Sequence, residues 1–203
     1  MSNGVELEEL LGLVDECLDG GDPEPALLLL QAENIKLIEQ FRCDPSLAVT
    51  GELFRMADAL SEQGQRLALH FASAGSSRLE ERAWELRSEP IQTAYPHKRN
   101  RIGPVLLDWA NCNRRIGEIE KADSLYEKII SDFSEILPWG PTFNDDWILS
   151  VRCLLEAVNK SSSERLDLSQ NISELLERSE DMREKEKVRK EKELAAHHRL
   201  PAL

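Results

Sequence analysis

The sequence predicts an all-α protein built from about nine helices. Apolar residues recur along most of the chain at the three- and four-residue spacing of amphipathic helices. No segment shows the alternation of apolar and polar residues, bounded by hairpin turns, that predicts strands. Only 5% of the 203 residues are aromatic and 31% are charged, which is typical of soluble helical proteins rather than of sandwiches or barrels. The length suits one domain or an extended repeat array.

The first three helices are predicted by apolar spacing and by paired start signals. The first covers residues 5–18, where the apolar positions are Leu7, Leu10, Leu11, Val14 and Leu18. Asp22 then serves as an N-cap, and Pro23 takes the first helical position, where its missing N–H is not needed. This second helix extends to about residue 42. Asp44 and Pro45 repeat the same pair and begin a third helix.

The middle of the chain is predicted to hold two shorter helices and an internal break. We expect the third helix to end near Gln63, with Gly64 in a turn, and a short helix to reach the segment SAGSS. The next helix contains Leu79, Ala83, Trp84 and Leu86. Residues 88–104 include three prolines and interrupt the pattern, so we expect the break there.

Four helices are predicted after this break. One runs from Pro104 to about Ile116, and the next runs from about Glu118 to Leu137. The segment PWGPTFND then interrupts the chain. Asn144 caps a further helix, and the last, long helix follows the segment NKSSSE.

Residues 104–137 have the pattern of a helical pair joined by a tight turn at Gly117. Ala110 and Ala122 supply small residues where two such helices would cross. Together with Leu106, Trp109, Asn113, Tyr126 and Ile129, this spacing resembles a divergent tetratricopeptide repeat. The first two helices fit the same register through Leu10, Leu13, Val14, Cys17, Gly21, Ala26 and Leu30. The third and fourth fit it in part, with Gly64 as the turn glycine.

This resemblance implies a right-handed α-solenoid of antiparallel helical hairpins over residues 1–180, with the internal break at 88–104. An irregular helical bundle is the alternative, because a glycine turn followed by an alanine-containing helix is not rare. Stacking favours the repeat, since one hairpin cannot bury its own apolar face and about three are needed.

The resemblance also implies a concave groove that binds an extended peptide or another protein. The asparagine that grips a terminal carboxylate in some members of the family corresponds to Asn111, with Arg114 and Arg115 nearby. Asp15 and Asp58 occupy the equivalent places in the first two units. We therefore expect these five residues to bind a partner, with a cation at the acidic end and an anion at the other. The alternative is that they are solvated charges on amphipathic helices.

The net charge of −13 is concentrated in the N-terminal half. Residues 1–90 contain 18 acidic and 7 basic side chains, a net charge of −11. Such a surface repels phosphate groups, so nucleic acid and anionic membranes are not expected partners, whereas a basic protein segment is. The basic segment HKRNR, residues 97–101, is interpreted as an exposed loop; the alternatives are that it pairs with the acidic half or docks a partner. Neither a signal peptide nor a membrane span is indicated, and we expect a cytoplasmic protein.

The last helix is predicted to have two parts. Its first part has an apolar stripe that would cover the end of the stack, formed by Leu166, Leu168, Ile172, Leu175 and Leu176. Residues 181–203 are charged, and their side-chain pairs contribute only about 0.2–0.5 kcal/mol each. We expect this tail to fray in the monomer, or to be held by a partner or by a second copy in an oligomer.

The sequence contains no pattern of catalytic residues. The four cysteines are widely spaced and are expected to be reduced core residues, and neither a metal nor another cofactor is indicated. The function expected is a non-enzymatic scaffold or adaptor that binds a partner protein. Two alternatives remain: a chaperone or inhibitor that masks a basic partner, and a structural subunit of a larger complex.

Overall fold

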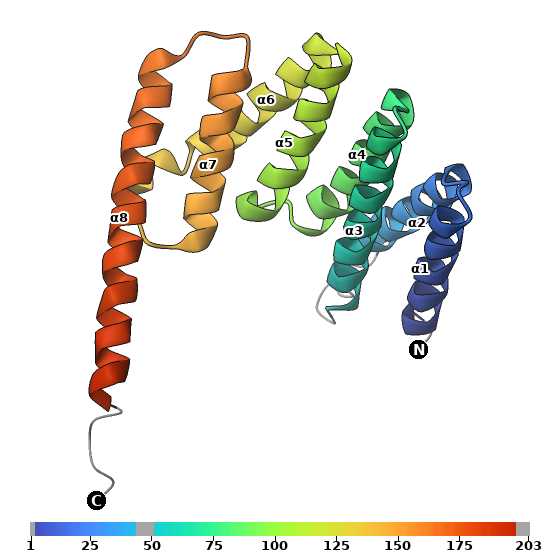
Figure 1. Cartoon of the computed structure of the whole chain (residues 1–203), viewed down its shortest axis with the longest axis horizontal. Coiled ribbons are helices and arrows are strands. Elements are labelled where there is room, and N and C mark those ends of the chain that lie inside the picture. Colours follow the sequence, from blue (N-terminus) through green and yellow to red (C-terminus); the bar gives the residue numbers. More distant parts are fainter. Residues whose placement is uncertain (1–2, 44–50, 198–203) are drawn as a thin grey trace, which may run out of the picture. The chain divides into compact units, whose positions relative to one another are not determined.

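The computed structural model describes residues 3–43 and 51–197. These residues form eight α-helices and a short 3-10 helix, and no strand is present among them, so the predicted all-α class is confirmed. The elements are shown in Figure 1: α1 (Asn3–Asp19), α2 (Glu24–Cys43), α3 (Glu52–Ser73), α4 (Ser77–Ala94), α5 (Arg99–Ile116), α6 (Ile119–Ser134), η2 (Leu137–Trp139), α7 (Asp145–Lys160) and α8 (Leu166–His197).

The chain divides into two compact units, residues 1–125 and 126–203, and the boundary falls within α6. In the first unit, α1 contacts α2 and α3, while α4 contacts α2, α3 and α5 (Figure 1). The core of this unit consists of apolar side chains from helices α1 to α5, among them Val14, Leu30, Leu37, Leu60, Leu67, Phe71, Leu86 and Cys112. Full burial of one such large side chain contributes about 1.5–3 kcal/mol.

Gly64 lies inside α3 and not in a turn, so the prediction that a helix ends there is wrong. A Cβ atom at this position would lie 2.8 Å from the Cα atom of Arg87 in α4, which is closer than non-bonded carbon atoms approach each other. The glycine therefore serves close packing of α3 against α4. One continuous helix replaces the two that were predicted, which is why the described residues contain eight α-helices and not about nine. The predicted cap at Asp44 and Pro45 lies outside the described residues.

The internal break is much shorter than residues 88–104. Helix α4 continues through Pro90 to Ala94, and α5 begins at Arg99, five residues before Pro104. Proline cannot donate to the carbonyl four residues earlier, which for Pro90 is the carbonyl of Leu86. The side-chain amide of Asn34 in α2 donates to that carbonyl at 2.7 Å. A residue distant in sequence thus replaces the lost helical hydrogen bond and lets α4 continue.

The predicted end of α5 at Gly117 is confirmed. The glycine adopts φ +92°, in the left-handed region that residues with a Cβ atom avoid. The N–H of Glu118 donates to the carbonyl of Asn113 at 2.9 Å, which satisfies a carbonyl of the last helical turn. Ala122, on the helix that follows, is completely buried.

The second unit contains the rest of α6, η2, α7 and α8. Asn144 caps α7 as predicted, because its side-chain oxygen accepts from the N–H of Trp147 at 3.0 Å. Ser179 of α8 is buried and its hydroxyl accepts from the N–H of Thr142 at 3.0 Å. The guanidinium of Arg183 lies 2.7 Å from Asp145 at the start of α7. The later described ion pairs of α8 lie within that helix.

Candidate functional site

Asp15 connects α1 to α3. Its carboxylate accepts a hydrogen bond from the guanidinium of Arg66 at 2.6 Å, and Arg66 also donates to the side chain of Gln63 at 2.8 Å. Asp15 and Arg66 are both exposed, so the ion pair contributes at most about 1 kcal/mol to stability. In this structure Asp15 is therefore already paired with a cation of its own chain.

Asp58 of α3 is held by two residues that flank the break between α4 and α5. The hydroxyl of Tyr95 donates to its carboxylate at 3.0 Å, and the guanidinium of Arg101 lies 3.6 Å from it. The same guanidinium lies over the Tyr95 ring, 5.3 Å from the ring centre. Burial, followed by the hydrogen bond to Asp58, raises the pKa of Tyr95 to about 12, so the phenol is a neutral donor at physiological pH.

Arg115 of α5 forms an ion pair with Glu80 of α4. Glu80 is buried, and its carboxylate also accepts from the indole N–H of Trp84 at 3.1 Å. The hydrogen bond to Glu80 raises the pKa of Arg115. Burial, together with the charge of Glu80, raises the pKa of the Cys112 thiol to about 12, so this buried thiol is not a nucleophile at neutral pH. Arg115 thus neutralises a buried carboxylate.

Asn111 and Arg114 lie on the same helix, half-buried and exposed respectively. Of the five predicted partner-binding residues, Asp15, Asp58 and Arg115 make contacts in three different places, each with another part of the first unit. The structure thus gives these three residues a role inside the chain that the sequence pattern did not indicate. Their proposed role toward a partner stays a prediction.

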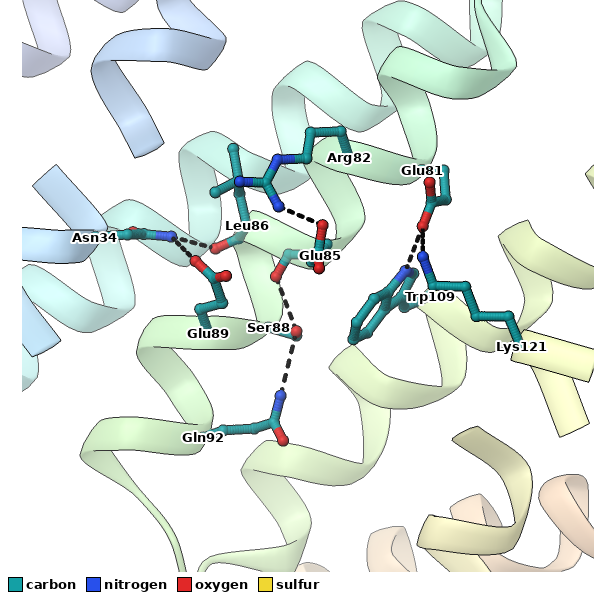
Figure 2. Close-up of polar contacts among 10 residues, drawn as sticks. All are labelled: Asn34, Glu81, Arg82, Glu85, Leu86, Ser88, Glu89, Gln92, Trp109 and Lys121. Carbon is teal, nitrogen blue, oxygen red and sulfur yellow. Dashed lines mark hydrogen bonds and ion pairs between the residues drawn. The ribbon is translucent and has the colours of Figure 1, made fainter. Parts of the chain in front are cut away.

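Polar contacts also cover both sides of α4, as Figure 2 shows. On one side, Asn34 donates to the Leu86 carbonyl and, at 3.2 Å, to the carboxylate of Glu89. On the other, Glu81 accepts from the indole N–H of Trp109 at 3.4 Å and pairs with Lys121, whose ammonium lies 5.4 Å from the centre of the Trp109 ring. These contacts join α4 to α2, α5 and the start of α6.

The described ranges contain no group of side chains suited to a metal ion. No three His, Cys, Asp or Glu side chains of residues 3–43 and 51–197 are grouped so that they would hold a metal ion. No helix within these ranges has the length and the apolar character needed to cross a membrane.

The outer surface of α1 and α2 carries carboxylates of a different kind from Asp15 and Asp58. These carboxylates are exposed, and their side chains have no hydrogen-bond or ion-pair partner among the described residues. We call them the acidic surface, which consists of Glu8, Glu9, Glu16, Asp19, Asp22, Glu24 and Glu39. Residues 3–43 contain 10 acidic and 2 basic side chains, a net charge of −8. Because the carboxylates are unpaired, their field extends into solvent and attracts cations.

An exposed apolar stripe lies on α2, within the same two helices. Leu28 is 68% exposed and Ile35 is 50% exposed, and the exposed Ala32 lies between them; we call these three residues the α2 stripe. The inward side of α2 instead presents the buried residues Ala26, Leu27, Leu30 and Leu37. Sequence reasoning missed this stripe. The signal was the apolar run of residues 26–30, because five consecutive helical residues, 100° apart, cannot all face one core.

No protein-family model, no curated protein and no solved structure matches the chain. The functional argument therefore rests on the surface itself.

Proposed function

We propose that this protein is a non-enzymatic scaffold that binds a basic segment of a partner protein through the acidic surface of α1 and α2. The observation that carries the proposal is the set of seven exposed carboxylates without a partner in the described part of the chain. Asp15 and Asp58 contribute less to this attraction than the sequence suggests, because arginines of the same chain already lie beside them.

The fold suits such a role. In the first unit, helices α1 to α5 pack against one another and form a framework on which the side chains of the acidic surface are held. A right-handed solenoid of antiparallel helical hairpins, as in tetratricopeptide repeats, is the arrangement we propose for it, and Gly117 with the buried Ala122 and Tyr126 supports this proposal.

Charge reversal at the acidic surface tests the function. A quadruple variant with Glu9, Glu16, Glu24 and Glu39 changed to Lys is compared with a control in which four exposed carboxylates of α8 (Glu174, Glu177, Glu184 and Glu191) are changed to Lys. Partners are captured from the source cells with the unaltered chain, identified by mass spectrometry and purified. We then expect the first variant to lose affinity for the purified partner and the control to retain it.

Salt dependence provides the second measurement. Binding through exposed charges weakens as the ionic strength rises, because the Debye length falls from about 10 Å at 0.1 M salt to about 3 Å at 1 M. The dissociation constant should therefore increase steeply between these two concentrations. A purified partner that binds the quadruple variant as tightly as the unaltered chain contradicts the proposal.

A chaperone or inhibitor that masks a basic partner would use the same acidic surface. Both functions occupy the basic segment of the partner, so both would compete with heparin for it. They differ in the partner's own activity: a masking protein suppresses that activity in the complex, whereas a scaffold leaves it intact. An assay of the purified partner with and without this chain distinguishes them.

A further inference from the structure

The α2 stripe and the acidic surface overlap on one side of α2. Leu28, Ala32 and Ile35 are spaced at i, i+4 and i+7, so they lie along one line of the helix. Glu24 precedes this line by four residues and Glu39 follows it by four, and both carboxylates are exposed. The side thus has an apolar centre of about 10 Å, seven residues at 1.5 Å each, with one negative charge at each end.

Other sides of α2 are already in contact with the first unit. The helix contacts α1, α3 and α4, and Figure 1 shows it beside α1 at one end of this unit. The α2 stripe lies on the part of its circumference that these contacts leave to solvent, together with the exposed Pro25 and Lys36, and the ammonium of Lys36 pairs with Glu33. Leu28 and Ile35 are not isolated exposed apolar residues, because they lie along the same line of the helix as Ala32 and form one apolar surface with it.

Charge decides what kind of molecule this side accepts. A second copy would bring another α1 and α2 with a net charge of −8 against the first, and an anionic membrane would be repelled in the same way. A basic partner is attracted. An amphipathic helix is the segment that presents apolar side chains at the matching spacing of three and four residues.

We infer that the α2 stripe is a docking site for an amphipathic helix of a partner protein, whose apolar residues at i, i+3 or i+4 and i+7 are flanked by Lys or Arg one turn before and one turn after. The inference rests on the proposed function and narrows it from a basic segment to a basic amphipathic helix. The apolar residues of the partner would cover Leu28 and Ile35, while its cations would meet Glu24 and Glu39.

Three synthetic peptides of equal length test this inference with the full chain. The first contains leucines at helical i, i+4 and i+7 positions flanked by lysines, the second replaces its lysines by glutamates, and the third keeps the composition of the first in a scrambled order. Binding is measured by fluorescence anisotropy, and the contact surface is located by NMR chemical-shift changes. We expect the first peptide to bind most tightly and to shift the α2 signals.

The double variant L28Q/I35Q tests the apolar contribution without changing the charge. Both residues are exposed, so the variant should keep its helical circular dichroism. We expect it to bind the first peptide about tenfold more weakly or worse, as substitution of central contact residues does. L166Q is the matched control, because Leu166 is 79% exposed on α8, and its binding should not change.

The outcomes separate this inference from the proposed function. If the scrambled peptide binds as tightly as the first, or if L28Q/I35Q has no effect while E24K/E39K weakens binding, the helix-docking site is overturned and the acidic surface stands. If neither L28Q/I35Q nor E24K/E39K alters binding, both the helix-docking site and the proposed binding by the acidic surface are contradicted. A dimer in light scattering that L28Q/I35Q dissociates would assign the stripe to a second copy and overturn the inference.

Discussion

The side-chain amide of Asn34 in α2 donates to the carbonyl oxygen of Leu86 at 2.7 Å, the acceptor that the backbone N–H four residues later in α4 would ordinarily use. Pro90 is the residue that lacks this N–H. Asn34 is completely buried, so its donor hydrogens have no access to bulk water. The contact therefore joins α2 to α4 and also replaces the hydrogen bond that Pro90 cannot donate within α4.

Removal of the Asn34 side-chain amide should lower the free energy of unfolding, and the size of this loss should depend on whether residue 90 is proline. We expect N34A to lower the free energy of unfolding by about 1–3 kcal/mol, because the buried carbonyl of Leu86 loses its donor. In the background of P90A the backbone N–H of residue 90 becomes available to that carbonyl. The cost of N34A should then be smaller by about 0.5–1.5 kcal/mol. Urea unfolding of the four proteins of this cycle measures the difference, and strictly additive effects would contradict the explanation.

Two helical glycines should respond in opposite directions to substitution by alanine. G64A introduces a Cβ atom 2.8 Å from the Arg87 Cα atom and should destabilise the protein by about 1–3 kcal/mol, because backbone must move. Gly12 in α1 has no such neighbour within 4 Å. G12A should therefore raise the free energy of unfolding by about 0.5–1 kcal/mol, since alanine favours the helix. Urea denaturation checks both, and a stabilised G64A protein would show that α3 and α4 are further apart than described.

The hydrogen bond between Tyr95 and Asp58 should be visible in the alkaline titration of the tyrosine. The chain has two tyrosines, so Y126F leaves Tyr95 as the source of the phenolate absorbance near 295 nm. We expect a midpoint of about pH 12, above the ordinary value of 10.0. D58N should lower the midpoint but not restore 10.0, because burial is the largest cause of the shift.

The same shift has a defined sign for stability. The folded protein binds the phenolic proton more tightly than the unfolded chain does, so the contribution is complete below pH 10 and disappears as the pH rises toward 12. Circular dichroism recorded at each pH confirms that the titrating species is folded. A midpoint near 10 in a folded protein would show that Tyr95 is neither buried nor bonded to Asp58 as described, and a D58N midpoint equal to that of Y126F alone would show that the hydrogen bond does not contribute.

The features that the sequence predicted correctly are those that depend on neighbouring residues. The cap at Asn144 and the turn at Gly117 are of this kind, because the bonds that form them span three to five residues. Gly64 and Pro90 were misjudged because residues 23 and 56 positions away decide their environment, Arg87 for the first and Asn34 for the second. A local pattern does not contain that information.

In the candidate site, too, the sequence predicts local features but not the contacts between residues that are distant in the chain. Asp15 and Asp58 were recognised as charged positions, but the pairing of Asp15 with Arg66 and of Asp58 with Arg101 depends on how the helices pack. The overall negative charge of the N-terminal half needs no folding to be known, and it still supports the basic partner. The α2 stripe required the structure, because only helix packing tells which leucines of residues 26–30 face outward.

The terminal part of α8 provides the last prediction, which concerns local opening. Arg183 makes the last described ion pair between α8 and another element, with Asp145 of α7, and the pairs that follow lie within the helix. Intrahelical pairs contribute about 0.2–0.5 kcal/mol each, which is less than the roughly 1–2 kcal/mol of backbone entropy lost by each ordered residue. Hydrogen exchange of residues 184–197 in the monomer should therefore be fast, while residues 147–158 of α7, which include the buried Val151 and Leu154, stay protected. Strong protection of residues 184–197 in a protein that light scattering shows to be monomeric would mean that the helix is stable by itself. Protection that appears only at high protein concentration would instead support the oligomer expected through this helix.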